Sequence, residues 1–500
     1  MLMIMNIKKI NPSLWHNTCI NRFRVKDTTM ADKEKMMTIY AIRRQFIPIV
    51  IVAALTAGAP FTARAGGNGY LPVSAPPELA RLIEEGLSNN QSIRALEAET
   101  AASRERIVSA GALPDPRIGF GLQNLPTDSF RFDKEPMTQK QVAVEQKIPW
   151  LSKLDLDSQM AAMTFAQKQA SAAAARITLA KRIADAYWSL GDITRQQVLN
   201  DRLIKLVTRI RRDAQSQYSV GKGQQQNIFQ AEVELSQLTD TRIKLENKRR
   251  SLADRLNELL NREQRAPIAP PGLPPLPDLQ LQIQALTATA LVNNPDMRIQ
   301  KAAMDRARLA VKRARKDYYP DTNLRLAYGQ RDHDRTGRDL PDFFSASVMM
   351  NIPLWQGSSQ DKDLKAALAD RDAAENNYQD LRRRLPYQID TRVTAIRDTM
   401  ERVALYRDSL IPQTRQWARS SDDAYQVDRV AFDTMIDARM RVLEIELTAH
   451  RLMFQLYQQR AELEALIGKP LSAGGNARPH GNSINDNPGK EDKNESNEIS

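Results

Sequence analysis

Hydrophobic side chains recur at helical spacing along two very long stretches of this sequence. The first, from Ser152 to Tyr218, contains no Pro and a single Gly, so it predicts one helix of roughly 100 Å. After a turn at Tyr218–Gln226, the chain is predicted to return alongside. Hydrophobic residues follow both segments at intervals of three, four or seven: Leu199, Leu203, Leu206, Ile210, Leu238, Leu245, Leu252 and Leu259. This spacing predicts an antiparallel coiled coil.

A second hairpin of the same kind is predicted in the C-terminal half, with kinks at Pro386 and Pro412. Its return helix carries a stripe with steps of three and four: Ile436, Met440, Leu443, Leu447, His450, Phe454, Tyr457 and Ala461. Because His450 lies on this stripe, we interpret it as a hydrogen-bonding residue between two helices.

Four short runs instead alternate between apolar and polar residues, which predicts β-strands. They are Arg117–Asn124, Thr138–Ile148, Thr322–Gln330 and Phe343–Ile352. Strands of about 9–11 residues with one apolar face can also cross a membrane. A soluble hairpin is the alternative for either pair alone, but two equivalent pairs favour a membrane location. We expect the lipid-facing residues to include Ile118, Phe120, Val142, Val144, Phe344, Val348 and Met350.

The chain contains two copies of one plan, because several short sequences recur in order at an offset of 204–207 residues. The recurring pairs are Leu87–Asn90 with Leu291–Asn294, Leu113–Asp115 with Tyr319–Asp321, Ile148–Leu151 with Ile352–Trp355, Tyr218–Val220 with Tyr425–Val427, and Ile228–Ala231 with Met435–Ala438. Each copy is predicted to begin with a single helix, at about 77–111 and 280–317, and to end it before the Pro-Asp pair.

Five segments follow from this plan. Residues 66–264 and 279–471 are the two structural repeats, and residues 265–278 form a linker with six Pro. Residues 472–500 are polar and are predicted to form a disordered tail. Residues 1–65 combine basic residues, an apolar run and the sequence Ala63-Arg64-Ala65, which together predict a cleaved secretory signal. A signal of ordinary length would begin at Met37, so we expect the true start downstream of residue 1.

Charge then loses most of its diagnostic value. The whole chain has 500 residues and a net charge of +12, which falls to +5 without the ten basic and three acidic residues of the signal. A nucleic-acid partner is therefore not indicated. The single Cys lies within the signal, the four His are far apart, and no catalytic or phosphate-binding motif is present. We expect no enzyme activity, no cofactor and no bound metal.

Four strands cannot form a closed membrane barrel alone. Unpaired backbone groups are costly in lipid, and small barrels begin near eight strands, so strands must be shared between subunits. This argument predicts self-assembly into a ring but leaves the number of subunits open.

With an export signal, a tandem repeat, paired strands and hundred-ångström hairpins, residues 77–470 resemble the TolC-type outer-membrane efflux channels. The local sequences Leu113-Pro114-Asp115-Pro116, Gln123-Asn124-Leu125-Pro126 and Ile148-Pro149-Trp150, followed by Lys153-Leu154, are most similar to the heavy-metal branch. The resemblance implies a mainly α fold in which helical hairpins form an α-barrel tunnel. It also implies that four strands per chain complete a shared twelve-stranded barrel in a homotrimer.

The same resemblance implies a passive exit duct for metal ions or small toxic compounds. Its partners would be a periplasmic adaptor, an inner-membrane resistance-nodulation-division pump and outer-membrane lipid. The alternatives are a periplasmic adaptor, which would need Gly-rich strands around one hairpin, or a soluble coiled-coil structural protein of the envelope.

The family motif at the hairpin tips, Tyr-x-x-Gly followed by an acidic residue before an apolar pair, is partly retained. Asn227 and Thr434 replace acidic residues, and Asp428 replaces a Gly. By resemblance, the adaptor would contact Gly221, Lys222, Gly223, Asn227 and Asp428. The periplasmic aperture would involve Asp437, Tyr425, Arg429 and Arg439, with Asp437 forming a ring of carboxylates that favours cations.

Overall fold

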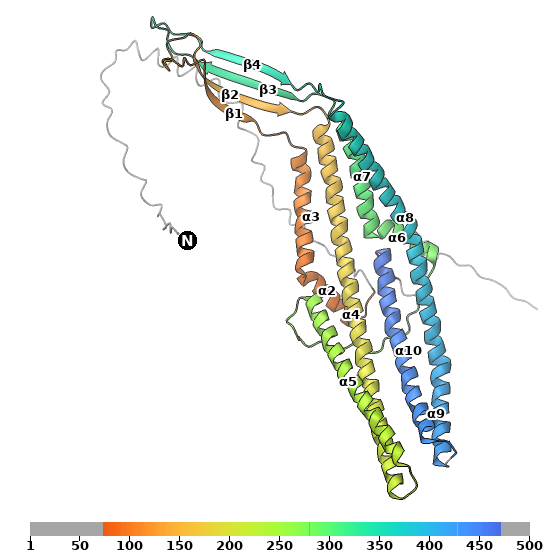
Figure 1. The fold of residues 1–500 in the computed structure, drawn as a ribbon. Helices are drawn as coiled ribbons and strands as arrows, with labels where there is room; N and C mark the ends of the chain where they lie inside the picture. The colour runs from red at the N-terminus through yellow and green to blue at the C-terminus, as the bar shows by residue number, and fades with distance from the viewer. Residues whose placement is uncertain (1–73, 280, 428, 472–500) are drawn as a thin grey trace, which may run out of the picture. The chain divides into compact units, whose positions relative to one another are not determined.

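The computed structural model describes residues 74–279, 281–427 and 429–471. The chain divides into two units, Met1–Asn68 and Gly69–Ser500, and every described residue belongs to the second. The predicted signal at 1–65, the tail at 472–500 and Asp428 therefore lie outside the described residues. Figure 1 shows long helices running side by side, with a sheet at one end.

The first hairpin consists of α4 (Lys153–Ser219) and α5 (Gln225–Leu260), which pack along each other. In the second, α8 (Gln360–Leu405) continues through a short π-helix, η1 (Tyr406–Leu410), into α9 (Ile411–Gln426), and α10 (Phe432–Ile467) returns. Pro386 lies inside α8, and Pro412 lies in the first turn of α9, directly after η1. The two long hairpins expected from the hydrophobic spacing are confirmed.

The single helix that we expected at the start of each repeat is wrong in both places. Two helices stand there instead: α2 (Pro77–Asn89) and α3 (Gln91–Ala110), then α6 (Ile283–Asn293) and α7 (Pro295–Lys316). The breaks fall at Asn90 and Asn294, whose side chains accept hydrogen bonds from the amides of Ile93 and Met297. Asn is a preferred N-cap residue, which explains why the helix restarts at both sites.

The four strands form one antiparallel sheet in the order β1-β2-β3-β4. Their bounds are Arg117–Gln123, Gln139–Ile148, Thr322–Gln330 and Phe343–Met350. The central pairing, between β2 and β3, joins the two repeats. Within this sheet β1 and β4 are the edges, so each has one side without a partner strand.

The core lies where the helices of the two repeats meet. One apolar cluster joins α2, α4, α5 and α10, and includes Ile83, Trp188, Leu256 and Phe454. Gly191 of α4 allows α10 and the Pro-rich linker to pack closely against α4, because a Cβ there would lie 2.6 Å from both Phe454 Cε1 and Pro271 Cγ. None of the helices in the described ranges is long and apolar enough to cross a membrane.

Glu464 of α10 binds the backbone of Ser74 and of Leu471, the first and last described residues. It is fully buried, and its carboxylate accepts hydrogen bonds from the amides of Ser74 at 2.7 Å and Leu471 at 3.0 Å. Arg460 Nε donates to the same carboxylate at 3.0 Å. Burial raises the pKa of Glu464 against the opposing effect of Arg460.

Candidate functional site

The sheet has one apolar and one polar face, and its register shows which residues belong to each. Directly opposite residues point to the same side of a sheet. Phe120 lies opposite Val142, Val142 opposite Tyr328, and Tyr328 opposite Phe344, so one apolar row crosses all four strands. The pairs of Ile118 with Val144 and of Leu324 with Val348 extend the same face.

This apolar face is open to the surroundings. Phe120 is 81% exposed and Phe344 is 72% exposed, and Ile118, Val142, Val144, Val348 and Met350 are exposed as well. The register therefore brings together on one face all seven residues that the sequence suggested for lipid contact. An exposed apolar surface of this kind marks an interaction with a membrane or with another protein.

The opposite face carries a hydrogen-bonded polar network. Gln139 Nε2 donates to Gln123 Oε1 at 2.7 Å, and Arg325 donates to Gln141 Oε1 at 3.0 Å. Because the two faces differ so sharply, the sheet can separate an apolar environment from water.

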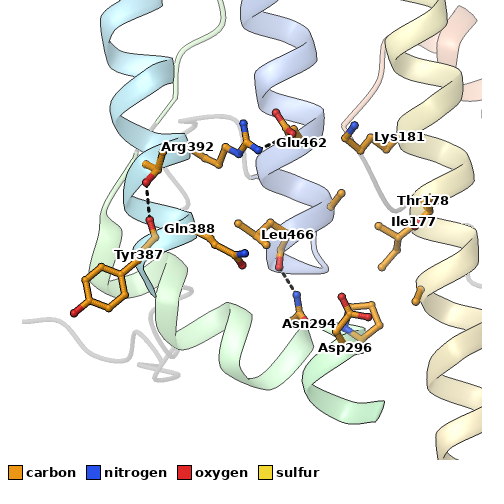
Figure 2. A pocket seen from close by; sticks show the side chains of 14 residues that line it. Ile177, Thr178, Lys181, Asn294, Asp296, Tyr387, Gln388, Arg392, Glu462 and Leu466 are labelled. Carbon is orange, nitrogen blue, oxygen red and sulfur yellow. Dashed lines mark hydrogen bonds and ion pairs between the residues drawn. The ribbon is translucent and has the colours of Figure 1, made fainter. Parts of the chain in front are cut away.

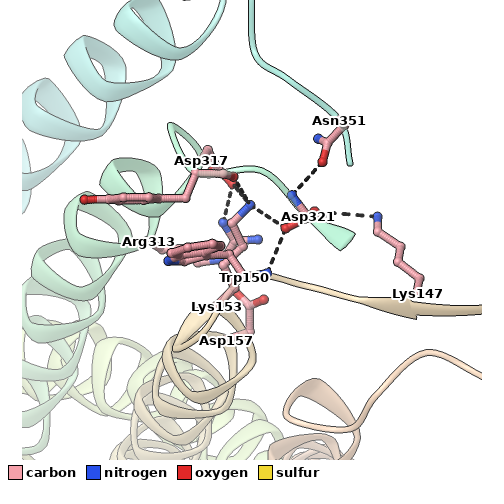
Figure 3. A network of polar contacts seen from close by, with 9 residues as sticks. Lys147, Trp150, Lys153, Asp157, Arg313, Asp317, Asp321 and Asn351 are labelled. Atoms are coloured by element: carbon pink, nitrogen blue, oxygen red, sulfur yellow. Dashed lines mark hydrogen bonds and ion pairs between the residues drawn. The ribbon is translucent and has the colours of Figure 1, made fainter. Parts of the chain in front are cut away.

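A polar cluster around the buried Lys153 connects the sheet to the helices (Figure 3). Lys153, at the start of α4, is 4% exposed and lies 2.8 Å from Asp321 and 3.3 Å from Asp317. The Trp150 amide also donates to Asp321 at 2.9 Å, and the Trp150 ring stacks on Tyr319 at 5.0 Å. Burial by itself would raise the pKa of Asp321, but the hydrogen bonds and positive charge of Lys153 and the Trp150 amide lower it overall.

At the far end of the first hairpin, the tip is a tight turn. Gly221 has φ of +73°, a left-handed conformation that Gly adopts without strain. The amides of Lys222 and Gly223 both donate to the Gln217 carbonyl, at 3.0 and 3.1 Å. Gly221 and Lys222 are exposed, and Asn227 lies half-buried in the first turn of α5.

The second tip contains one hydrogen bond that corresponds to this turn. The Arg429 amide donates to the Ala424 carbonyl at 2.9 Å, the counterpart of the bond from Lys222 to Gln217. Tyr425 joins the two hairpins, because its hydroxyl donates to Gln217 Oε1 at 3.0 Å and its ring packs near Phe432.

Two charged residues of α10 near this tip have different surroundings. Arg439 pairs with Asp422 of α9 at 2.5 Å, so it links the two helices of one hairpin. Asp437 is exposed, and in the ranges that the structure describes its side chain has no hydrogen bond or ion pair. The Asp437 carboxylate is therefore open to the surroundings in the single chain.

Farther from the tips, α4 of the first hairpin contacts α10 of the second through His450, which is confirmed as an interhelical hydrogen-bonding residue. Arg195 Nε of α4 donates to His450 Nδ1 at 3.2 Å. Burial lowers the pKa of His450 to about 4; the charges of Arg195 and Arg202 lower it too, and that of Glu446 opposes them. The neutral imidazole is therefore the form that this contact holds.

A pocket of about 520 Å³, which the sequence gave no reason to expect, lies where α10 ends and α7 begins, between α4 and α8 (Figure 2). Lys181, Asp296, Arg392 and Glu462 contribute charged groups, and Arg392 pairs with Glu462 at 3.0 Å. Asn294 closes one side, since its side-chain amide donates to the Leu466 carbonyl at 2.8 Å. The described residues contain no group of three or more His, Cys, Asp or Glu side chains that could hold a metal ion.

The family model for outer membrane efflux proteins matches residues 82–262 and 286–469, one segment in each repeat. The chain therefore belongs to the outer membrane efflux protein family. It is an outer-membrane channel component of a tripartite efflux pump. The two alternatives, an adaptor or a soluble coiled-coil protein, are set aside.

Solved channels share the fold. The chain resembles the outer-membrane channel OprN, with 16% identity over 79% of this chain and 90% of that chain and a TM-score of 0.66. It also resembles the outer membrane protein VceC from Vibrio cholerae, with 17% identity over 79% and 97% and a TM-score of 0.67. It resembles CusC as well, a protein solved in a study of folding and transmembrane channel formation, with 14% identity over 78% of this chain and 92% of that chain and a TM-score of 0.66. No curated protein matches the chain in sequence.

Proposed function

We propose that three copies of this chain form a passive exit duct through the outer membrane. The observation that carries the proposal is a sheet with one exposed apolar face and two open edges, placed at the end of long helical hairpins. Twelve strands from three copies would close the sheet and enclose a lumen, whereas eight would be filled by side chains. The apolar face would then meet lipid, and the polar face would line water.

The helices would continue this duct as a tunnel in the periplasm. Water in the tunnel lets cargo move down its gradient, so the chain needs no chemistry at the wall. Export by a signal within residues 1–65 would deliver the chain to this site. The cargo class we propose is metal ions or small toxic compounds, from the resemblance of the sequences around Pro114 and Trp150 to the heavy-metal branch.

The hairpin tips would form the entrance and meet the adaptor of a resistance-nodulation-division pump. One hairpin presents an exposed or half-exposed turn that contains Gly221, Lys222, Gly223 and Asn227. In the sequence, Asp428 is the position that corresponds to Gly221 in the other hairpin. The Tyr425–Gln217 hydrogen bond ties the two hairpins of one chain together. An adaptor that binds the tips better when this contact is broken would shift the population toward an open entrance.

Replacing Asp437 tests the proposed entrance. Three copies of this exposed carboxylate around one axis would attract cations and narrow the entrance. In planar bilayers, Asp437→Ala should raise the single-channel conductance and weaken the preference for cations. Asp423→Ala, which removes an exposed carboxylate from α9 of the same hairpin, is the matched control and should leave both unchanged. Equal behaviour of the two variants would remove Asp437 from the entrance, and a protein that forms no channel would refute the duct.

A further inference from the structure

The seam between the two repeats within one chain is fully described and serves as a template. Across it β2 pairs with β3, and Val144 lies directly opposite Leu326. Where the sheet meets the helices, Trp150 stacks on Tyr319.

The sequence repeat gives a map from positions of the first repeat to positions of the second repeat in the same chain, and the observed strand pairs test that map. Ile148 corresponds to Ile352, an offset of 204 for β2 and β4; Asp115 corresponds to Asp321, an offset of 206 for β1 and β3. These offsets convert the observed pair Ile118–Val144 into Leu324–Val348, which is the pair that the structure contains. Both offsets are even, so the map also keeps each residue on its own face of the sheet.

We propose that the seam between two copies of this chain repeats the seam inside one chain. This inference rests on the shared barrel proposed above and adds its register. The template pair Val144–Leu326 becomes Val348 of one copy opposite Phe120 of the next. Met350 then lies opposite Ile118, and the apolar face runs on without interruption from β4 to the neighbouring β1.

The register gives a barrel of acceptable geometry. Directly opposite residues lead from Phe120 across the sheet to Phe344, and the proposed seam leads from Phe344 to Asn124 of the next copy. The row of opposite residues therefore starts at Phe120 in β1 of one copy and reaches β1 of the next copy at Asn124, a displacement of four residues along the strand. Around three copies the displacement of about twelve residues over twelve strands corresponds to a strand tilt of about 35°, within the usual range of roughly 35–45°.

The map also describes the contact beside the sheet. Leu354 takes the place of Trp150, and Leu113 takes the place of Tyr319, so two leucines replace the stacked rings. Leu354 is 74% exposed in the single chain, and Leu113 is exposed as well. The neighbouring copy would cover both, whereas an isolated chain leaves them in contact with water.

The charged part of the template is not repeated. Gly357 stands where Lys153 stands in the first repeat, so Asp115, the counterpart of Asp321, has no buried lysine to meet across the new seam. Two copies would therefore meet through apolar contacts and backbone hydrogen bonds. Ions that must lose water on association are avoided, which suits an interface formed between separate chains.

The test is a disulfide between strands of neighbouring copies. In a Cys19→Ser background, which removes the only native Cys, Phe120→Cys is combined with Val348→Cys, Met350→Cys or Ala346→Cys. All these positions lie on one face, and the second and third pairs are shifted by two residues either way. Directly opposite positions bring Cβ atoms to about 4.5–5.5 Å and diagonal positions only to about 7–8 Å, so the first pair should give at least roughly fivefold more crosslinked product after oxidation in detergent with diamide.

Each outcome has a defined meaning. Covalent dimers and trimers from the Phe120–Val348 pair alone support the register. Preferential crosslinking through Met350 or Ala346 overturns the register while keeping the barrel. If light scattering shows trimers and no pair crosslinks, β4 does not meet the neighbouring β1. If no variant and no parent protein forms trimers, the proposed duct itself fails, which separates the two ideas.

Discussion

Removing the buried lysine at the junction of sheet and helices should destabilise the protein strongly. In Lys153→Met, Asp321 loses its cation at 2.8 Å while remaining largely buried. Breaking a buried ion pair from one side typically costs about 3–5 kcal/mol. We expect the lower value, about 3 kcal/mol, because the Trp150 amide still donates to Asp321 and Lys147 remains 3.8 Å away.

The expected shift in melting temperature follows from the size of the chain. Unfolding about 400 residues has an entropy of roughly 0.8 kcal/mol per kelvin, so about 3 kcal/mol corresponds to about 3–4 °C. The assay is thermal unfolding of the detergent-solubilised protein, with all variants compared at one scan rate.

Two variants make this prediction specific. Lys147→Met removes an exposed lysine from the same aspartate and should change the melting temperature by less than about 1 °C. Lys153→Met with Asp321→Asn removes the unpaired charge and should recover more than half of the loss. The reasoning is refuted if the two lysine variants are equally stable, or if the double variant is no better than Lys153→Met alone.

Three further outcomes are expected. The pKa of His450 falls from 6.5 to about 4 on folding, so its contribution to stability, at most about 3 kcal/mol, is complete above pH 6.5 and is lost as the pH falls through 4. Melting curves between pH 7.5 and 4 should show this loss, and His450→Gln should flatten it; an unchanged pH profile contradicts the assignment. Gly191→Val should cost about 2 kcal/mol or more, because its side chain would overlap Phe454, and chemical denaturation should detect it; a stability equal to the parent's would exclude a tight contact there. Phe120→Lys should reduce the yield of assembled protein in the outer membrane, because a lysine on the lipid face at mid-membrane costs about 2–4 kcal/mol on insertion. Full assembly of this variant would place the face away from lipid.

Much of this architecture could be predicted from the sequence because its patterns are long and repeated. The alternating runs located all four strands to within two residues, and the first long helix was placed to within one. The offset between repeats matched the observed strand register, since both copies must present the same face to the same surroundings.

What the sequence did not reveal depends on local capping and on distant packing. In the sequence, Asn90 and Asn294 stand out only as repeated positions, although Pro295 directly after the second is a typical first residue of a helix. The π-helix at Tyr406–Leu410 and the pocket beside Asn294 arise from how separate helices meet, and no short pattern encodes them. Nothing in the sequence around Lys153 shows that it is buried, because its partners Asp317 and Asp321 come from the other repeat.

The carboxylate of Glu464 has a consequence for the order of folding. It receives the Ser74 amide from a position 390 residues earlier and the Leu471 amide from seven residues later. Closing so large a loop costs entropy that is recovered only once distant segments have met. The described body therefore cannot be completed while α10 is still being synthesised, and the contact that joins its first and last residues forms only after residue 471 has been added.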